Sequence, residues 1–177
     1  MSSPVIDPTA FIAPTALIMG DVWVGAESSI WYTAVLRGDM APIRIGSQTN
    51  LQDGTIVHVD EDIACTIGDR VGVGHRVILH GCTVEDDCLI GMGSILLNGA
   101  AVGRGSLVAA GSLLTEGTRV PPGSLVMGVP GKVVRPITDE LSRRIEETWR
   151  RYLGQARRHR AGDFPLVKCV DHIAERV

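Results

Sequence analysis

The chain has 177 residues, enough for one domain with a full apolar core and too few to suggest two large ones. A formal net charge of -3 gives no basic footprint for nucleic acid, and no run of about 18 apolar residues indicates a membrane span. Because the N-terminus lacks a basic region followed by an apolar stretch, we expect a cytoplasmic protein.

Aliphatic residues recur at every sixth position along most of the chain. The series begins with Ile12, Ile18, Val24, Ile30 and Leu36, shifts phase three times, and then runs unbroken from Val84 to Val126. Neither an α-helix nor an alternating strand produces a period of six. We therefore predict an all-β fold, a left-handed parallel β-helix of hexapeptide repeats, in which three units form one triangular rung. The left hand is known for such coils and is not revealed by the period itself.

The pattern divides the chain into three parts. We assign residues 1–136 to the β-helix, 137–161 to a C-terminal amphipathic α-helix and 162–177 to a tail. Thr138 offers an N-cap for this helix, and its apolar residues from Leu141 to Ala156 fall at helical spacing. The phase shifts predict two short loops that leave the coil, near residues 37–42 and 60–64.

Three of the five histidines lie within the coil, and the repeat places two of them in one column. His58 and His80 each follow an inward aliphatic residue, and one full turn separates them. Two imidazoles one strand spacing apart can bind the same metal ion. His75 lies on the preceding face, so only another subunit can present it to that pair. We therefore predict a metal site of His58, His75 and His80 between the subunits of a homotrimer.

The same stepping places charged residues beside these columns. Arg37 lies one rung before His58, and Asp53 lies one rung before His75. Because the two columns meet across the predicted interface, we expect Arg37 of one subunit to pair with Asp53 of the next. Asp39 is either a carboxylate close to the metal site or interface, or a solvated acid of the predicted loop.

Together these residues resemble the γ-class carbonic anhydrase family, in the bacterial subgroup often called ferripyochelin-binding or transferase-like hexapeptide proteins. The resemblance covers roughly residues 4–155. It rests on Leu36-Arg37-Gly38-Asp39, on Asn50-Leu51-Gln52-Asp53-Gly54 followed by His58, and on His75 with His80 five residues later. It implies a homotrimer with interfacial metal ions, Zn²⁺ or alternatively Fe²⁺ or Co²⁺, bound by matches of these three histidines.

The resemblance also implies an activity, the reversible hydration of CO₂ to bicarbonate. In the family, residues matching Arg37, Asp39, Gln52 and Asp53 surround the metal, and Gln52 is expected to orient the attacking hydroxide. The best-studied branch carries an extended acidic loop after its first histidine, where this chain has only residues 60–64. Glu61 is therefore the candidate proton shuttle, and the short loop argues against rapid turnover.

Two other classes of function stay open. Hexapeptide acyltransferases share the coil and a closing segment much like residues 120–135, and they need one histidine as a general base. They do not require two stacked histidines and a third in an opposing column. The other alternative is a non-catalytic trimer that keeps its metal ion for structure or for binding a ligand, and the short acidic loop is its main support.

Overall fold

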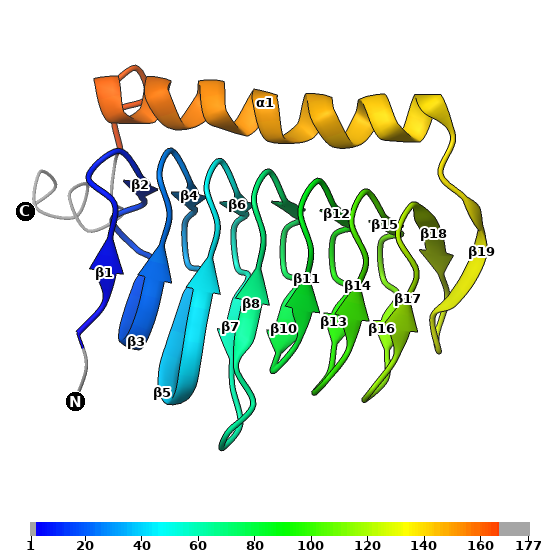
Figure 1. Ribbon diagram of the computed structural model, residues 1–177. Helices are drawn as coiled ribbons and strands as arrows, with labels where there is room; N and C mark the ends of the chain where they lie inside the picture. The colour runs from blue at the N-terminus through cyan, green and yellow to red at the C-terminus, as the bar shows by residue number, and fades with distance from the viewer. Residues whose placement is uncertain (1–2, 167–177) are drawn as a thin grey trace, which may run out of the picture.

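A computed structural model describes residues 3–166 of the chain. These residues form a parallel coil of about seven turns, with one helix lying along its side (Figure 1). The predicted fold class, a left-handed parallel β-helix with a C-terminal α-helix, is confirmed. Most of the predicted tail, residues 167–177, lies outside the described part of the chain.

The strands stack into three columns, which make the three faces of the coil. The histidine face carries the first halves of β3 and β5, and then β7 (Ile56–His58), β10 (Ile78–His80), β13 (Ile95–Leu96) and β16 (Leu113–Leu114). The helix-covered face carries β2 (Phe11–Ile12), β4 (Ser29–Ile30), β6 (Asn50–Leu51), β9 (Gly72–Val73), β12 (Leu89–Ile90), β15 (Leu107–Val108), β18 (Ser124–Met127) and the antiparallel β19 (Lys132–Pro136). The polar face carries β1 (Val5–Ile6), the second halves of β3 and β5, β8 (Cys65–Ile67), β11 (Thr83–Val84), β14 (Ala101–Val102) and β17 (Arg119–Val120).

Two long strands, β3 (Leu17–Val24) and β5 (Val35–Ile45), run continuously around one corner of the coil. The predicted loop at residues 37–42 is therefore wrong, because these residues belong to β5. The first half of β5 pairs with β7 and its second half pairs with β8, so ladder hydrogen bonds hold both ends of the segment extended, while residues 39–42 between them have no partner in these pairings. The phase shift seen in the sequence appears as a register irregularity opposite Gly20–Val22 of β3.

The second predicted loop, at residues 60–64, is confirmed as a tight turn. An isolated antiparallel bridge joins Asp60 to Ile63, and the turn links β7 to β8. It projects beyond the corners of the neighbouring rungs (Figure 1). This position beside β7 brings the turn close to the histidine face.

The core of the coil consists of the inward aliphatic residues that the six-residue period predicts. Leu36, Val57, Leu79 and Leu96 stack in one such column, and each side chain is fully buried. Burying a side chain of this size contributes about 1.5–3 kcal/mol to folding, so the stacked columns are the main source of stability. The coil therefore provides a rigid base for the side chains on its outer faces.

Helix α1 (Asp139–Ala161) lies along the helix-covered face and runs back towards the first rungs (Figure 1). The Thr138 hydroxyl caps it by accepting from the Leu141 backbone N–H, as predicted. Ile145 packs against a column of leucines on the coil. Among the helices of residues 3–166, none has the length and apolarity needed to cross a membrane.

Candidate metal centre

His58 and His80 stand side by side on the histidine face. They are direct partners in the register of β7 and β10, which confirms their predicted stacking. His58 Nδ1 lies 3.1 Å from His80 Nε2. The two nitrogens therefore converge on one small region at the surface of the coil.

The spacing of this pair fits two ligands of one metal ion. Two nitrogens bound to a tetrahedral ion at about 2.0–2.1 Å lie about 3.3 Å from each other. The pair alone is not a complete site. Within residues 3–166, no three His, Cys, Asp or Glu side chains gather closely enough to hold a metal ion. The described part of one chain therefore brings two histidine nitrogens close together here, without a third such side chain beside them.

His75 lies apart from that pair, beside helix α1. Its Nδ1 is 2.9 Å from Asp53 Oδ2, and because a carboxylate only accepts hydrogen bonds, Nδ1 carries the proton. His75 Nε2 is left for another partner and lies 3.4 Å from the Tyr152 hydroxyl. Burial raises the pKa of Tyr152, so this hydroxyl stays protonated. The predicted neighbours Asp53 and His75 are thus in contact.

Arg37 and Asp39 lie next to the histidine pair, on its other side. Arg37 is the register partner of His58, and its guanidinium donates to Asp39. Asp39 Oδ1 is also 3.1 Å from His58 Nε2. The hydrogen bond from Arg37 lowers the pKa of Asp39, so a carboxylate faces His58. Arg37 is paired within its own chain, and its predicted pairing with Asp53 of a second subunit stays a prediction.

The other two predicted site residues are more loosely connected to the histidines. Gln52 is buried and donates to Asn50 Oδ1 at 3.0 Å. Glu61 is exposed in the turn after β7. Within the described chain, neither side chain hydrogen-bonds to a histidine. The predicted roles of Gln52 in orienting the hydroxide and of Glu61 in carrying a proton therefore stay predictions.

Two contacts of the histidines were not predicted. Asn98 Oδ1 is 2.7 Å from His80 Nδ1, and Tyr152 contacts His75. Counting one rung on from His80 leads to the residue that directly precedes Asn98. The counting by rungs that located Arg37 could therefore have found Asn98 as well. Tyr152 was expected only as part of the apolar stripe of the helix.

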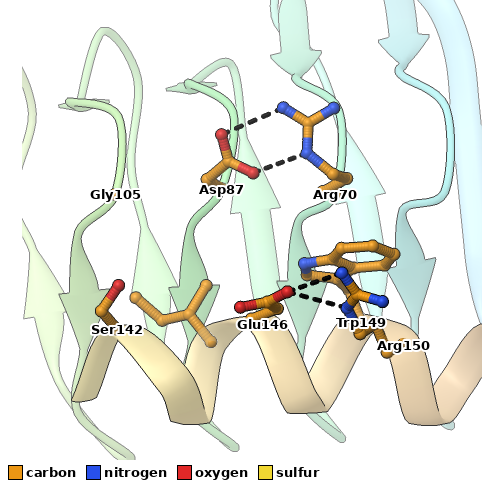
Figure 2. A pocket seen from close by; sticks show the side chains of 8 residues that line it. Arg70, Asp87, Gly105, Ser142, Glu146, Trp149 and Arg150 are labelled. Atoms are coloured by element: carbon orange, nitrogen blue, oxygen red, sulfur yellow. Dashed lines mark hydrogen bonds and ion pairs between the residues drawn. The ribbon is translucent and has the colours of Figure 1, made fainter. Parts of the chain in front are cut away.

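Among the cavities between helix α1 and the coil, two differ in their relation to the histidines. One of about 430 Å³ contains none of the coil histidines, and its charged side chains pair with one another: Arg70 with Asp87, and Arg150 with Glu146 (Figure 2). Such mutual pairing leaves no free charge to bind an ionic ligand. The other, of about 390 Å³, is lined in part by Asp53 and Tyr152, the two partners of His75.

Comparison with known proteins relates this chain to characterised families. Two overlapping segments, 65–98 and 81–116, match the hexapeptide repeat of succinyl-transferase. A carbonic anhydrase of Geobacillus kaustophilus is 46% identical over 169 residues, which cover 96% of this chain and 93% of that protein. The mitochondrial gamma carbonic anhydrase 2 of Arabidopsis thaliana is 46% identical over 163 residues, or 89% of this chain. This chain spans only 59% of that longer relative.

Solved structures give the same picture of the fold. The crystal structure of a hexapeptide transferase family protein from Anaplasma phagocytophilum has a TM-score of 0.84 at 44% identity, covering 87% of this chain and 91% of that one. The N-acyltransferase AntD of Bacillus cereus has a TM-score of 0.68 at 18% identity over 84% of this chain and 90% of that one, which shows a shared fold alone.

The fold and the stacked histidines define a hexapeptide-repeat protein with a close pair of histidines on one outer face. Because the Geobacillus relative is 46% identical and is covered over 93% of its length, the chain belongs to the γ-class carbonic anhydrase family. The family implies a metal ion without fixing which one.

Proposed function

We propose that the chain catalyses the reversible hydration of CO₂ to bicarbonate, at a metal site shared between the subunits of a homotrimer. One observation carries the proposal: His58 and His80 converge with a 3.1 Å separation, while His75 is held apart from them by Asp53. Three imidazoles with one open position are the donor set of a catalytic zinc site. We therefore propose Zn²⁺, with Fe²⁺ or Co²⁺ as alternatives.

The outer surface beside the histidine pair supports the proposed trimer. The outward residues of this face form a continuous aliphatic column in register: Leu17, Val35, Ile56, Ile78, Ile95 and Leu113. A contiguous exposed apolar surface commonly marks a protein interface. A second copy of the chain is the partner that would cover this column and also bring a third histidine to the pair.

The protein side chains have separate tasks in this proposal. When bound, the metal ion supplies the Lewis acidity that makes hydroxide available from water near neutral pH. Asp53 orients His75 by holding its Nδ1–H, and the Arg37–Asp39 pair holds the outer side of His58. We assign Gln52 to orienting the attacking hydroxide and the exposed Glu61 to carrying the released proton to solvent.

A subunit-mixing experiment tests the shared site. Chains with His75→Ala and chains with His80→Ala are each expected to be inactive alone. In every mixed trimer, however, one interface combines the intact His58–His80 pair of a His75→Ala chain with the intact His75 of a His80→Ala chain. Random mixing should therefore restore about one quarter of the wild-type metal content and CO₂ hydration rate. The measurements are metal per trimer and initial hydration rate after verified subunit exchange.

The matched control is a mixture of His58→Ala and His80→Ala chains. Both lesions lie in the pair that one chain provides, so no arrangement of these subunits rebuilds a site. Equal recovery in the two mixtures, or none in the first, would contradict the shared site. Metal loading without any CO₂ hydration by the wild type would instead favour the non-catalytic trimer.

The acyltransferase alternative has less support. It needs a single histidine as base, whereas this chain pairs two histidines and fixes a third with a carboxylate. The likeness to the acyltransferase AntD, at 18% identity, extends to the fold alone. The cytoplasmic location stays a prediction.

A further inference from the structure

We infer that Asn98 and Asp60 act together as positioning residues that fix the tautomer and orientation of His80. The inference rests on the proposed metal site and extends it to two residues outside the histidine set. Asn98 follows β13, one rung beyond His80, and Asp60 lies in the turn after β7. The three side chains form a continuous series of hydrogen bonds.

The direction of this series follows from Asp60. A carboxylate has no proton to donate, so the Asn98 amide must present its NH₂ group to Asp60 Oδ2, at 2.9 Å. The amide oxygen of Asn98 then faces His80 Nδ1 at 2.7 Å. An amide oxygen only accepts, so Nδ1 of His80 carries the hydrogen and Nε2 keeps its lone pair. That lone pair is the one directed at His58.

The opposite orientation of the amide is excluded by the same contacts. A flipped Asn98 would place its oxygen against the Asp60 carboxylate, oxygen to oxygen, and its NH₂ group against His80. His80 would then have to accept at Nδ1 and carry its hydrogen on Nε2, where a metal ligand needs a lone pair. Asp60 therefore selects the state of a histidine that it does not touch.

Gly81 provides the space in which these groups meet. A Cβ atom at this position would lie 2.5 Å from Asn98 Oδ1 and 2.8 Å from Ile63 Cγ2, distances that side chains do not tolerate. The Gly81 N–H also donates to the carbonyl of His58, at 3.0 Å. The residue after His80 thus lets the 60–63 turn and Asn98 pack directly beside this histidine.

The arrangement parallels that of His75. There a carboxylate, Asp53, holds Nδ1 directly. At His80 a neutral amide holds Nδ1, and a carboxylate one step further out holds the amide. Both histidines therefore have Nδ1 engaged by the protein and Nε2 left for another partner, as ligands of one metal ion require.

The first test reads the tautomer directly, without metal. Chains with ¹⁵N-labelled histidine are compared by NMR at about pH 8, where an ordinary imidazole is neutral, with His80 assigned through a His80→Gln chain. In the wild type, His80 is expected as the Nδ1–H tautomer. In Asp60→Asn and Asn98→Leu, the Nε2–H tautomer should become populated. Asp62→Asn is the matched control, because Asp62 is exposed in the same turn and loses the same charge.

The second test measures Zn²⁺ affinity by competition with a chelator. Loss of an outer partner of a ligand typically costs 10–100-fold in metal affinity, so we expect about a 10-fold or greater loss for Asn98→Leu and a smaller loss for Asp60→Asn. Asp62→Asn should bind as the wild type does. Asp60 lies on an exposed turn, so this variant stays readable even if Asn98→Leu folds poorly.

The two tests separate failure of this inference from failure of the proposed function. A wild-type His80 in the Nε2–H form, or a tautomer unchanged by Asp60→Asn and Asn98→Leu, would overturn the inference whatever the metal does. A wild type that binds no Zn²⁺ but shows the expected tautomers would overturn the proposed metal site and leave the positioning of His80 intact.

Discussion

The histidine face and the helix-covered face both carry outward aliphatic residues, but they differ in what lies over them. On the helix-covered face, Leu107 and Leu125 are each 7% exposed because helix α1 packs on them. On the histidine face, Ile56 and Ile78 remain 38% and 37% exposed, and no element of residues 3–166 packs over them. The described chain thus covers one apolar face by itself and leaves the other partly exposed.

The polar face shows that the exposed column is not a general property of the coil. In the same rungs, its outward positions carry Thr66 and Thr83, which are exposed to solvent. Both faces have equally well-buried inward residues, so folding does not demand aliphatic side chains on the outside. The outward aliphatic residues beside His58 and His80 therefore point to assembly.

The largest effect is expected from a charge on the histidine face. Ile78→Asp should dissociate the proposed trimer, because an aspartate at that interface would be desolvated without a partner. Sedimentation velocity at micromolar concentration should show monomers that have also lost their metal ion. Thr83→Asp, on the polar face of the same rung, is the matched control and should leave the trimer unchanged. A trimer that survives Ile78→Asp would exclude this face as the interface.

A smaller effect should appear on the helix-covered face. Leu107→Ala removes a buried side chain beneath α1, at a cost of about 2–5 kcal/mol, while leaving the interface face unaltered. Urea unfolding of the dissociated Ile78→Asp chain provides the measurement. Leu113→Ala in the same background is the control, since Leu113 is only partly buried in one chain and should cost less. Equal costs would mean that the two faces are equally covered.

The sequence was sufficient to predict these faces because the coil has a strict geometry. A period of six fixes the rung and face of each residue, so the stacking of His58 on His80 and the position of Arg37 beside them followed from counting. The same counting separated His75 from the pair. In few folds can residues that are distant in sequence but adjacent in space be identified so directly from the sequence. It is possible here because each rung pairs in register with the next.

Counting by rungs could not predict features that depend on hydrogen bonding at the corners of the coil or on the length and direction of individual side chains. A phase shift was interpreted as a loop at residues 37–42, but these residues stay within strand β5, where an irregular register against β3 absorbs the shift. The contact of Tyr152 with His75 depends on where α1 settles along the coil. The contact of Asp60 with Asn98 depends on the shape of a four-residue turn, which has no period.

The smallest effect concerns the interior behind the helix-covered face, where Cys88 directly precedes Leu89. Burial raises the pKa of Cys88 to about 12, from an ordinary value of 9.0. Above pH 9 the unfolded chain loses the thiol proton while the folded chain retains it, so the unfolded state binds fewer protons and stability falls as pH rises. The loss of stability is small at pH 8, begins near pH 9 and reaches about 1 kcal/mol by pH 10. Cys88→Ser keeps a donor in reach of the Gly103 carbonyl but does not ionise in this range. In urea unfolding at pH 8, 9 and 10, this variant should lose less stability than the wild type over the last step. Parallel losses in the two chains would mean that the thiol reaches solvent, and that the face covered by α1 is more open than its leucines indicate.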